Sequence, residues 1–212
     1  LEYGSIPGYD DLNEREIDDW KTHLAQRYGK DKEKIDRDDW KRANGWKIPS
    51  IVWVSLDAGL RPCEIEKSSI DWVDLRNGQL RIPKDDSSKN RDNWNVALKQ
   101  GTVEILRRWI KQRENYEKYN DTDALWLTRY SNPYQSASLG SLLKKIRDIG
   151  DIPPNGRDLS WYSIRHSTGT YMTHHEDLGA ARDQLRHKSK MTTLKYDHAP
   201  IEQRQKALNR MG

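Results

Sequence analysis

The spacing of the apolar residues constrains the fold of this 212-residue chain more than any other feature. They recur at helical intervals in most segments and alternate with polar residues in two short ones. Helices are predicted over residues 11–28, 46–60, 102–116, 136–149, 161–174, 177–187 and 200–211, and strands over residues 78–83 and 94–98. The predicted fold class is mainly α with a small antiparallel β-sheet, an α+β arrangement.

The chain length favours a single domain over residues 1–212. A lead segment that contains glycine and proline occupies residues 1–10, and a polar C-terminal tail helix is expected over residues 197–212. We find no internal repeat and no low-complexity tract that would divide the chain.

The composition restricts the kind of protein this can be. Charged residues make up 33% of the chain, and the pI of about 9.0 permits an anionic partner. The single cysteine, Cys63, excludes an internal disulfide framework and a multi-thiolate zinc site. No apolar run approaches the roughly 20 residues of a membrane span. We therefore expect an intracellular protein, cytoplasmic or nucleoid-associated, with no membrane partner.

Three segments carry the candidate chemistry. They read GLRPCEI over residues 59–65, YSIRHS over residues 162–167 and LRHKSKMTTLKY over residues 185–196. Together they resemble the three boxes of the tyrosine recombinase, or phage integrase, family, which read Gly-Leu-Arg-x-x-Glu, His-x-Leu-Arg-His-Ser/Thr and Leu-Gly-His-x-x-x-x-Thr-Thr-x-x-Tyr. The spacing of the third box is specific, since His187 precedes Tyr196 by nine positions with two threonines between them.

This resemblance implies a catalytic domain of that family, with Tyr196 as the nucleophile. Attack on a phosphodiester builds negative charge on the non-bridging oxygens, and the matching arginines, Arg61 and Arg165, would hold these oxygens through paired hydrogen bonds. His187 would donate a further hydrogen bond to the phosphate. A lysine between the two predicted strands would protonate the leaving 5′-oxygen as general acid. Lys84 fits this role by position, and Lys89 is the alternative.

The chain departs from the family pattern at two positions. Tyr162 stands where the second box has histidine, and Arg186 stands where the third box has glycine. A tyrosine can hydrogen-bond but titrates far from neutrality, whereas Arg186 is expected to add a phosphate contact. Four residues are predicted to bind DNA or phosphate: Lys89, Arg91, Arg186 and Lys188. No cofactor and no metal is expected.

Each candidate also has a structural interpretation. Arg61 could form a salt bridge at a helix end, Arg165 a buried ion pair, and Tyr196 an ordinary packing contact. His187 could lie on the surface, and Lys84 could belong to a solvated hairpin. His166 is interpreted as a structural residue, and the adjacent pair His174 and His175 as a solvated helix end, because neighbouring residues on a helix point in different directions.

The resulting hypothesis is a site-specific DNA recombinase, an integrase of a virus or mobile element. It would cut and rejoin double-stranded DNA through a 3′-phosphotyrosine intermediate without metal or ATP. By resemblance, it would act as a homotetramer on DNA, and a separate N-terminal core-binding domain is expected to be absent from this chain. The alternatives are DNA relaxation like that of a type IB topoisomerase, and a DNA-binding module that has lost catalysis.

Overall fold

The structure, a computed structural model, describes residues 13–36, 39, 45–87, 92–150, 152–153, 159–197, 205 and 209. The chain divides into two compact units, residues 1–46 and 47–212. The single domain expected over the whole chain stays a prediction. No helix within the described ranges is long and apolar enough to cross a membrane.

The first unit contains α1 (Glu14–Tyr28) and the short 3₁₀ helix η2 (Lys32–Lys34). Helix α1 confirms the predicted element from residue 14 onward, and residues 11–12 lie outside the described part. Leu24 and Ile35 are buried, and Lys30 forms a 2.6 Å ion pair with the buried Asp39. This unit therefore combines a small apolar contact with a partly buried ion pair.

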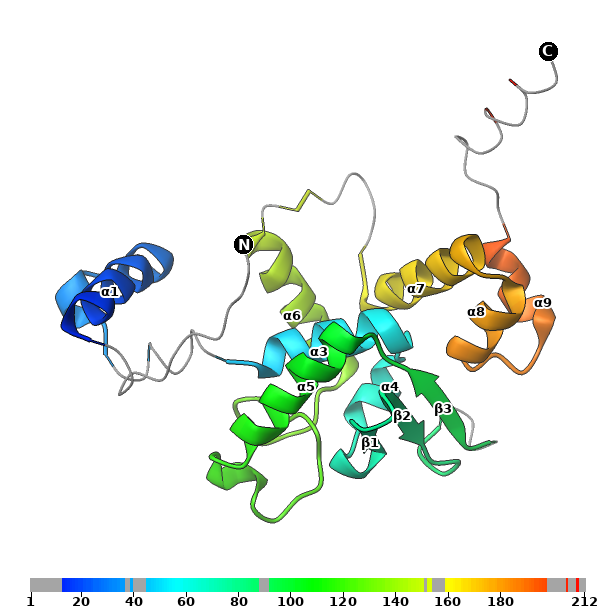
Figure 1. Cartoon of the computed structure of the whole chain (residues 1–212), viewed down its shortest axis with the longest axis horizontal. Coiled ribbons are helices and arrows are strands. Elements are labelled where there is room, and N and C mark those ends of the chain that lie inside the picture. The colour runs from blue at the N-terminus through cyan, green and yellow to red at the C-terminus, as the bar shows by residue number, and fades with distance from the viewer. Residues whose placement is uncertain are drawn as a thin grey trace. The chain divides into compact units, whose positions relative to one another are not determined.

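Helix α3 (Lys47–Ala58) is central to the second unit and packs against both α5 (Gln100–Arg113) and α7 (Trp161–His175) (Figure 1). Its buried side chains include Ile51 and Val54. Gly59 follows with a positive φ of 54°, which ends the helix two residues before the predicted end. The carbonyls at this helix end therefore face the segments that carry the candidate chemistry.

A three-stranded antiparallel sheet lies beside these helices, with β1 (Val73–Asp74), β2 (Gln79–Ile82) and β3 (Trp94–Ala97) in that order. Leu80 of β2 pairs with Val96 of β3, and both side chains are buried. The two predicted strands are thus confirmed. Strand β1 was not predicted, because two residues are too few to show an alternating pattern.

The remaining elements complete a mainly helical unit, which confirms the predicted fold class. They are α4 (Pro62–Glu66), η3 (Ile70–Trp72), η4 (Glu117–Tyr119), α6 (Ser136–Ile149), α8 (Leu178–Gln184), α9 (Lys190–Thr193) and η5 (Leu194–Tyr196). Helix α6 has the predicted bounds. Helix α5 begins two residues before the predicted start and ends three residues before the predicted end. Of the predicted tail helix over residues 197–212, the structure describes residues 197, 205 and 209, and Asp197 is the C-cap of η5 instead of a helical residue.

The helix predicted over residues 177–187 is wrong in its last three residues. Asp177 caps α8 by accepting a 2.7 Å hydrogen bond from the backbone N–H of Ala180, and the helix ends at Gln184. Arg186 has a φ of 58°, in the left-handed region that a residue with a Cβ rarely adopts. The turn that follows directs the next residue, His187, toward the interior, where it is buried.

Candidate active site

The first site segment is a tight turn that joins α3 to α4. A Cβ on Gly59 would lie 2.5 Å from a methyl carbon of Leu185, so only glycine fits both the space and the backbone conformation. Arg61 is the N-cap of α4, and its backbone N–H donates to Oε2 of Glu64 over 2.8 Å. Nη1 of Arg61 donates to Oε1 of the same carboxylate over 3.0 Å. Arg61 is thereby held in place while its side chain stays 20% exposed.

Arg165 approaches this turn from α7 and is buried, with 4% of its surface exposed. Its Nη1 donates to the carbonyl oxygen of Gly59, and its Nη2 donates to the carbonyl oxygen of Leu185. Burial, followed by the neighbouring charges of Arg186 and Arg61, lowers the pKa of Arg165 to about 9. The two carbonyls fix this guanidinium as a rigid cation beside the turn.

Arg186 lies in an internal network with the same turn. Its Nη2 donates to Glu64 Oε2 over 2.7 Å, and its Nε donates to Oε1 over 3.4 Å. The other hydrogen bonds reach the carbonyl oxygens of Ala58 at 2.6 Å, Gln184 at 2.9 Å and Gly59 at 3.1 Å. A guanidinium has five N–H donors, and each one here has a protein acceptor. The structure therefore places Arg186 in the interior instead of in the predicted phosphate contact.

His187 lies directly after this network and is 6% exposed. Its Nδ1 is 3.1 Å from Oγ1 of Thr193, which fixes the orientation of the ring. Burial, followed by the positive charges of Arg165 and Arg61, lowers the pKa of His187 to about 3. The imidazole is therefore neutral at physiological pH, so it can act as a hydrogen-bond donor but not as a cation.

The Tyr196 ring is stacked on the His187 ring, with the centroids 6.2 Å apart and the planes 4° from parallel. His166 also contacts the Tyr196 ring, edge to face, with the ring centroids 5.6 Å apart. A Cβ on Gly169 of α7 would lie 2.7 Å from two carbons of this ring, so the glycine allows the ring to rest directly on the helix. The predicted nucleophile thus contacts two imidazoles and the α7 backbone.

The Tyr196 hydroxyl is buried, and no hydrogen-bond partner lies within its reach among the residues that the structure describes. Burial raises the pKa of Tyr196 above its ordinary value, while the charges of Arg165 and Arg61 lower it. The ammonium of Lys195 lies 5.0 Å from the centroid of the tyrosine ring. Three segments far apart in the sequence therefore bring two guanidinium groups, an imidazole and a phenol to one place.

The other predicted site residues that the structure describes, Lys84, Tyr162 and Lys188, are exposed. Lys84 follows β2 in an exposed turn, where its backbone N–H donates to Oδ1 of Asn93 over 2.7 Å. Tyr162 is in the first turn of α7 and is 48% exposed. Lys188 is exposed and lies 3.6 Å from a carboxylate oxygen of Asp92. Lys89 and Arg91 lie outside the described residues.

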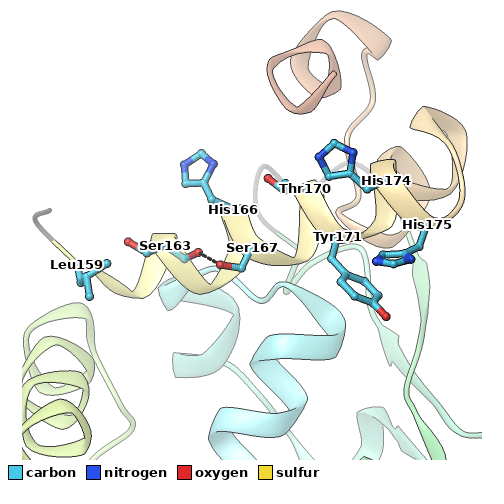
Figure 2. A pocket seen from close by; sticks show the side chains of 8 residues that line it. All are labelled: Leu159, Ser163, His166, Ser167, Thr170, Tyr171, His174 and His175. Carbon is cyan, nitrogen blue, oxygen red and sulfur yellow. Dashed lines mark hydrogen bonds between the residues drawn. The ribbon is translucent and has the colours of Figure 1, made fainter. Parts of the chain in front are cut away.

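A shallow pocket runs along the outer face of α7. Figure 2 shows His166, Thr170 and His174 on one side of the helix and Tyr171 on the other. The ring centroids of Tyr171 and His175 are 4.2 Å apart. In the part of the chain that the structure describes, no three side chains of histidine, cysteine, aspartate or glutamate are grouped as a metal ion would require. The adjacent histidines of α7 thus provide no metal site by themselves.

Sequence reasoning missed several residues that build the site. Glu64 was visible in the first motif, but its link to Arg186 lies across 122 positions of sequence. Thr193 and Gly169 gave no signal of their contacts with His187 and the Tyr196 ring. A local pattern cannot reveal such contacts, because they depend on how α7, α8 and α9 are packed.

A family model described as the phage integrase family matches residues 39–202, and the chain belongs to this family. Tyrosine recombinase XerC of Proteus mirabilis is 28% identical over 154 residues, which are 72% of this chain and 48% of that protein. The corresponding protein of Alcanivorax borkumensis is 26% identical over the same shares. The chain thus spans about half the length of these curated relatives.

Solved structures show the same fold. The crystal structure of XerA recombinase has a TM-score of 0.67 and 17% identity, over 95% of this chain and 84% of that one. XerH site-specific recombinase, in a post-cleavage complex with a palindromic difH substrate, has a TM-score of 0.65 and 21% identity, over 93% of this chain and 52% of that one. The fold is therefore that of a tyrosine recombinase catalytic domain.

Proposed function

We propose that this protein is a site-specific DNA recombinase that cuts and rejoins DNA strands through Tyr196. The observation that carries the proposal is the convergence of Arg61, Arg165 and His187 on the buried phenol of Tyr196. Two fixed guanidinium groups suit the two non-bridging oxygens of a phosphodiester, where negative charge grows during attack. Membership of the phage integrase family supports the same chemistry.

In the proposed reaction, the Tyr196 oxygen attacks the scissile phosphorus and the bond from phosphorus to the 5′-oxygen breaks. The phenolic proton passes to solvent, and the ammonium of Lys84 protonates the leaving 5′-oxygen. The product is a 3′-phosphotyrosine ester. A 5′-hydroxyl then attacks this ester and releases the tyrosine. Because one phosphoester bond replaces another, the cycle needs no ATP, and the arginines supply the charge that a metal would otherwise provide.

The reaction requires Tyr196 to move, because its hydroxyl is buried. The 3₁₀ helix η5 that carries it is only three residues long, and the segment leading to it is the short helix α9. Lys84 must likewise approach the phosphate from an exposed turn. We propose that DNA binding brings these two groups to the guanidinium pair, and that Tyr162 donates a hydrogen bond to the phosphate from the position where the family has histidine.

The proposed partner is double-stranded DNA, bound by a homotetramer. XerH bound to difH and a transposon integrase in complex with circular intermediate DNA are among the structurally similar proteins, as is a lambda integrase dimer bound to a core site. These relatives support DNA as the partner. We also propose that the protein acts at the nucleoid and serves a virus or another mobile element.

The test uses a suicide DNA substrate, in which a nick beside the cleavage site prevents religation. We expect the wild-type chain to form a covalent DNA adduct, detected by denaturing gel, and Tyr196→Phe to form none. Tyr171→Phe is the matched control, because Tyr171 is an exposed tyrosine on α7 outside the site. An adduct that persists in Tyr196→Phe would refute the assignment of the nucleophile.

Two other functions remain as outcomes of related assays. Relaxation of supercoiled plasmid regardless of sequence would indicate activity like that of a type IB topoisomerase. Salt-sensitive DNA binding without any adduct would indicate a binding module, because phosphate contacts alone give such binding. The proposed recombinase instead predicts an adduct on one class of DNA site and little relaxation of other DNA.

A further inference from the structure

Arg186 is the most constrained cation of the molecule's described part. Its backbone has a φ of 58°, and its side chain is 1% exposed. A left-handed backbone is unfavourable for any residue with a Cβ, so strong contacts are needed to hold it. All five N–H donors supply such contacts, to Glu64 and to carbonyls at the end of α3 and α8.

The Glu64 carboxylate is the point that Arg186 shares with the candidate phosphate site. It is fully buried and accepts hydrogen bonds from both Arg61 and Arg186. Burial alone would raise the pKa of Glu64, but the charge of Arg186, followed by that of Arg61, lowers it to about 2. Arg186 is therefore the main counter-charge of this carboxylate, ahead of Arg61.

This pairing decides how much positive charge is left for a phosphate. Arg165 feels the positive charges of Arg186 and Arg61 and the negative charge of Glu64. Three guanidinium groups against one carboxylate leave two net positive charges. If Arg186 were absent, Glu64 would be neutralised by Arg61 alone, and these guanidinium groups would keep only one net positive charge.

We propose that Arg186 is a positioning residue that neutralises Glu64 and thereby leaves the charge of Arg61 available for the scissile phosphate. It also shares the Gly59 carbonyl with Arg165, so one side chain holds the turn on which both phosphate-binding guanidinium groups depend. This inference rests on the proposed function and deepens it. The competing explanation is that Arg186 only holds the turn in place. In that case, the effect of removing Arg186 would not depend on the charge of Glu64 or of the substrate phosphate.

The experiment measures single-turnover adduct formation in Arg186→Met and in the double variant Glu64→Gln/Arg186→Met. Methionine keeps much of the side-chain length but removes the charge and the donors. Each variant is tested on ordinary DNA and on DNA with a methylphosphonate at the cleavage position, which carries one negative charge fewer. Arg186→Lys, which keeps the charge, is the conservative variant, and circular dichroism checks that each protein is folded.

We expect Arg186→Met to form the adduct about 100-fold more slowly on ordinary DNA, and about 10-fold more slowly at most on methylphosphonate DNA, because the neutral group needs less positive charge. The double variant should recover at least part of the loss, since Arg61 no longer faces a buried carboxylate. Arg186→Lys should retain more activity than Arg186→Met. Equal losses on both substrates, with no recovery in the double variant, would overturn the proposal in favour of a structural clamp.

A binding measurement keeps this inference separate from the proposed function. If the wild-type chain forms no Tyr196-dependent adduct, the proposed function fails, and calorimetric titration with inorganic phosphate then tests Arg186 by itself. Weaker phosphate binding in Arg186→Met, restored in the double variant, would support the role of Arg186. Unchanged phosphate affinity in a folded Arg186→Met protein would refute it. If Arg186→Met does not fold, Arg186→Gln, which also removes the charge, replaces it in both measurements.

Discussion

The guanidinium cluster (Arg61, Arg165 and Arg186) and Lys84, which lies in the exposed turn after β2, present positive charge in opposite ways. The cluster is held by buried carbonyls and the Glu64 carboxylate. Lys84 in the turn is exposed, and its hydrogen bonds with Asn93 and Ser87 are made by its backbone. Both regions are assigned to the same phosphate in the proposed reaction.

The difference concerns how each charged group reaches the position in which it would act on the phosphate. A group that stabilises developing charge works best when it is already fixed, because no reorganisation is then needed in the transition state. A general acid must instead deliver a proton to an oxygen that exists as a leaving group only during reaction, so it can arrive with the substrate. Buried and exposed cations should therefore respond differently when their charge is removed.

The largest effect is expected for Arg165→Ala. Removing a fixed donor from the transition state should slow adduct formation about 1,000-fold, at the upper end of the range for a single donor. Single-turnover cleavage per folded molecule is the measurement. The matched control is Arg113→Ala, because Arg113 is also a buried arginine bound to backbone carbonyls. A loss of the same size in that control would show that burial, and not phosphate binding, accounts for the result.

Lys84→Ala should slow cleavage about 100-fold, as expected when a general acid is lost. Replacing the leaving 5′-oxygen with sulfur should restore the rate, because a thiolate, with a pKa of about 8.5 in cysteine, leaves without a proton. The sulfur substrate should not rescue Arg165→Ala, which separates the exposed cation from the buried one. Rescue of Lys89→Ala but not of Lys84→Ala would transfer the general-acid role to Lys89.

Because Glu64 belongs to the buried network, the free energy of unfolding should depend on pH in the acidic range. The pKa of Glu64 is lowered from 4.5 to about 2 in the folded protein, so its stabilisation is present above pH 4.5 and is lost as the pH falls toward 2. The free energy of unfolding in urea should therefore fall between pH 5 and pH 3, provided that the protein still unfolds in one step. Glu64→Gln should be less stable at pH 7 and show a smaller decline; an equal decline would contradict the role given to this carboxylate.

The smallest effect is expected for Lys188→Ala. Lys188 is 65% exposed and lies 3.6 Å from Asp92, a surface pair of little energetic value. If it contacts a DNA phosphate, its loss should reduce the slope of log affinity against log salt by about 1. Fluorescence anisotropy over a range of salt concentrations measures this slope. An unchanged slope would remove Lys188 from the DNA-binding residues.

Much of the fold could be predicted from local patterns. The period of the apolar residues gave α3, α6 and α7, and the alternation of residues gave β2 and β3. The pattern failed near Arg186, where a predicted helix ends early. An arginine carries no local signal for a left-handed backbone, because the partner that stabilises it, Glu64, lies 122 residues away in sequence.

The sequence by itself determined the identity of the candidate groups, because three short motifs with fixed spacing name Arg61, Arg165, His187 and Tyr196. Only the tertiary structure decided the protonation, burial and pairing of the side chains: His187 is neutral, the Tyr196 phenol is buried, and Arg186 is paired with Glu64. The physical reason is that a side chain's chemistry is fixed by its covalent structure, whereas its charge state and free donors depend on burial and on partners that folding brings from distant segments.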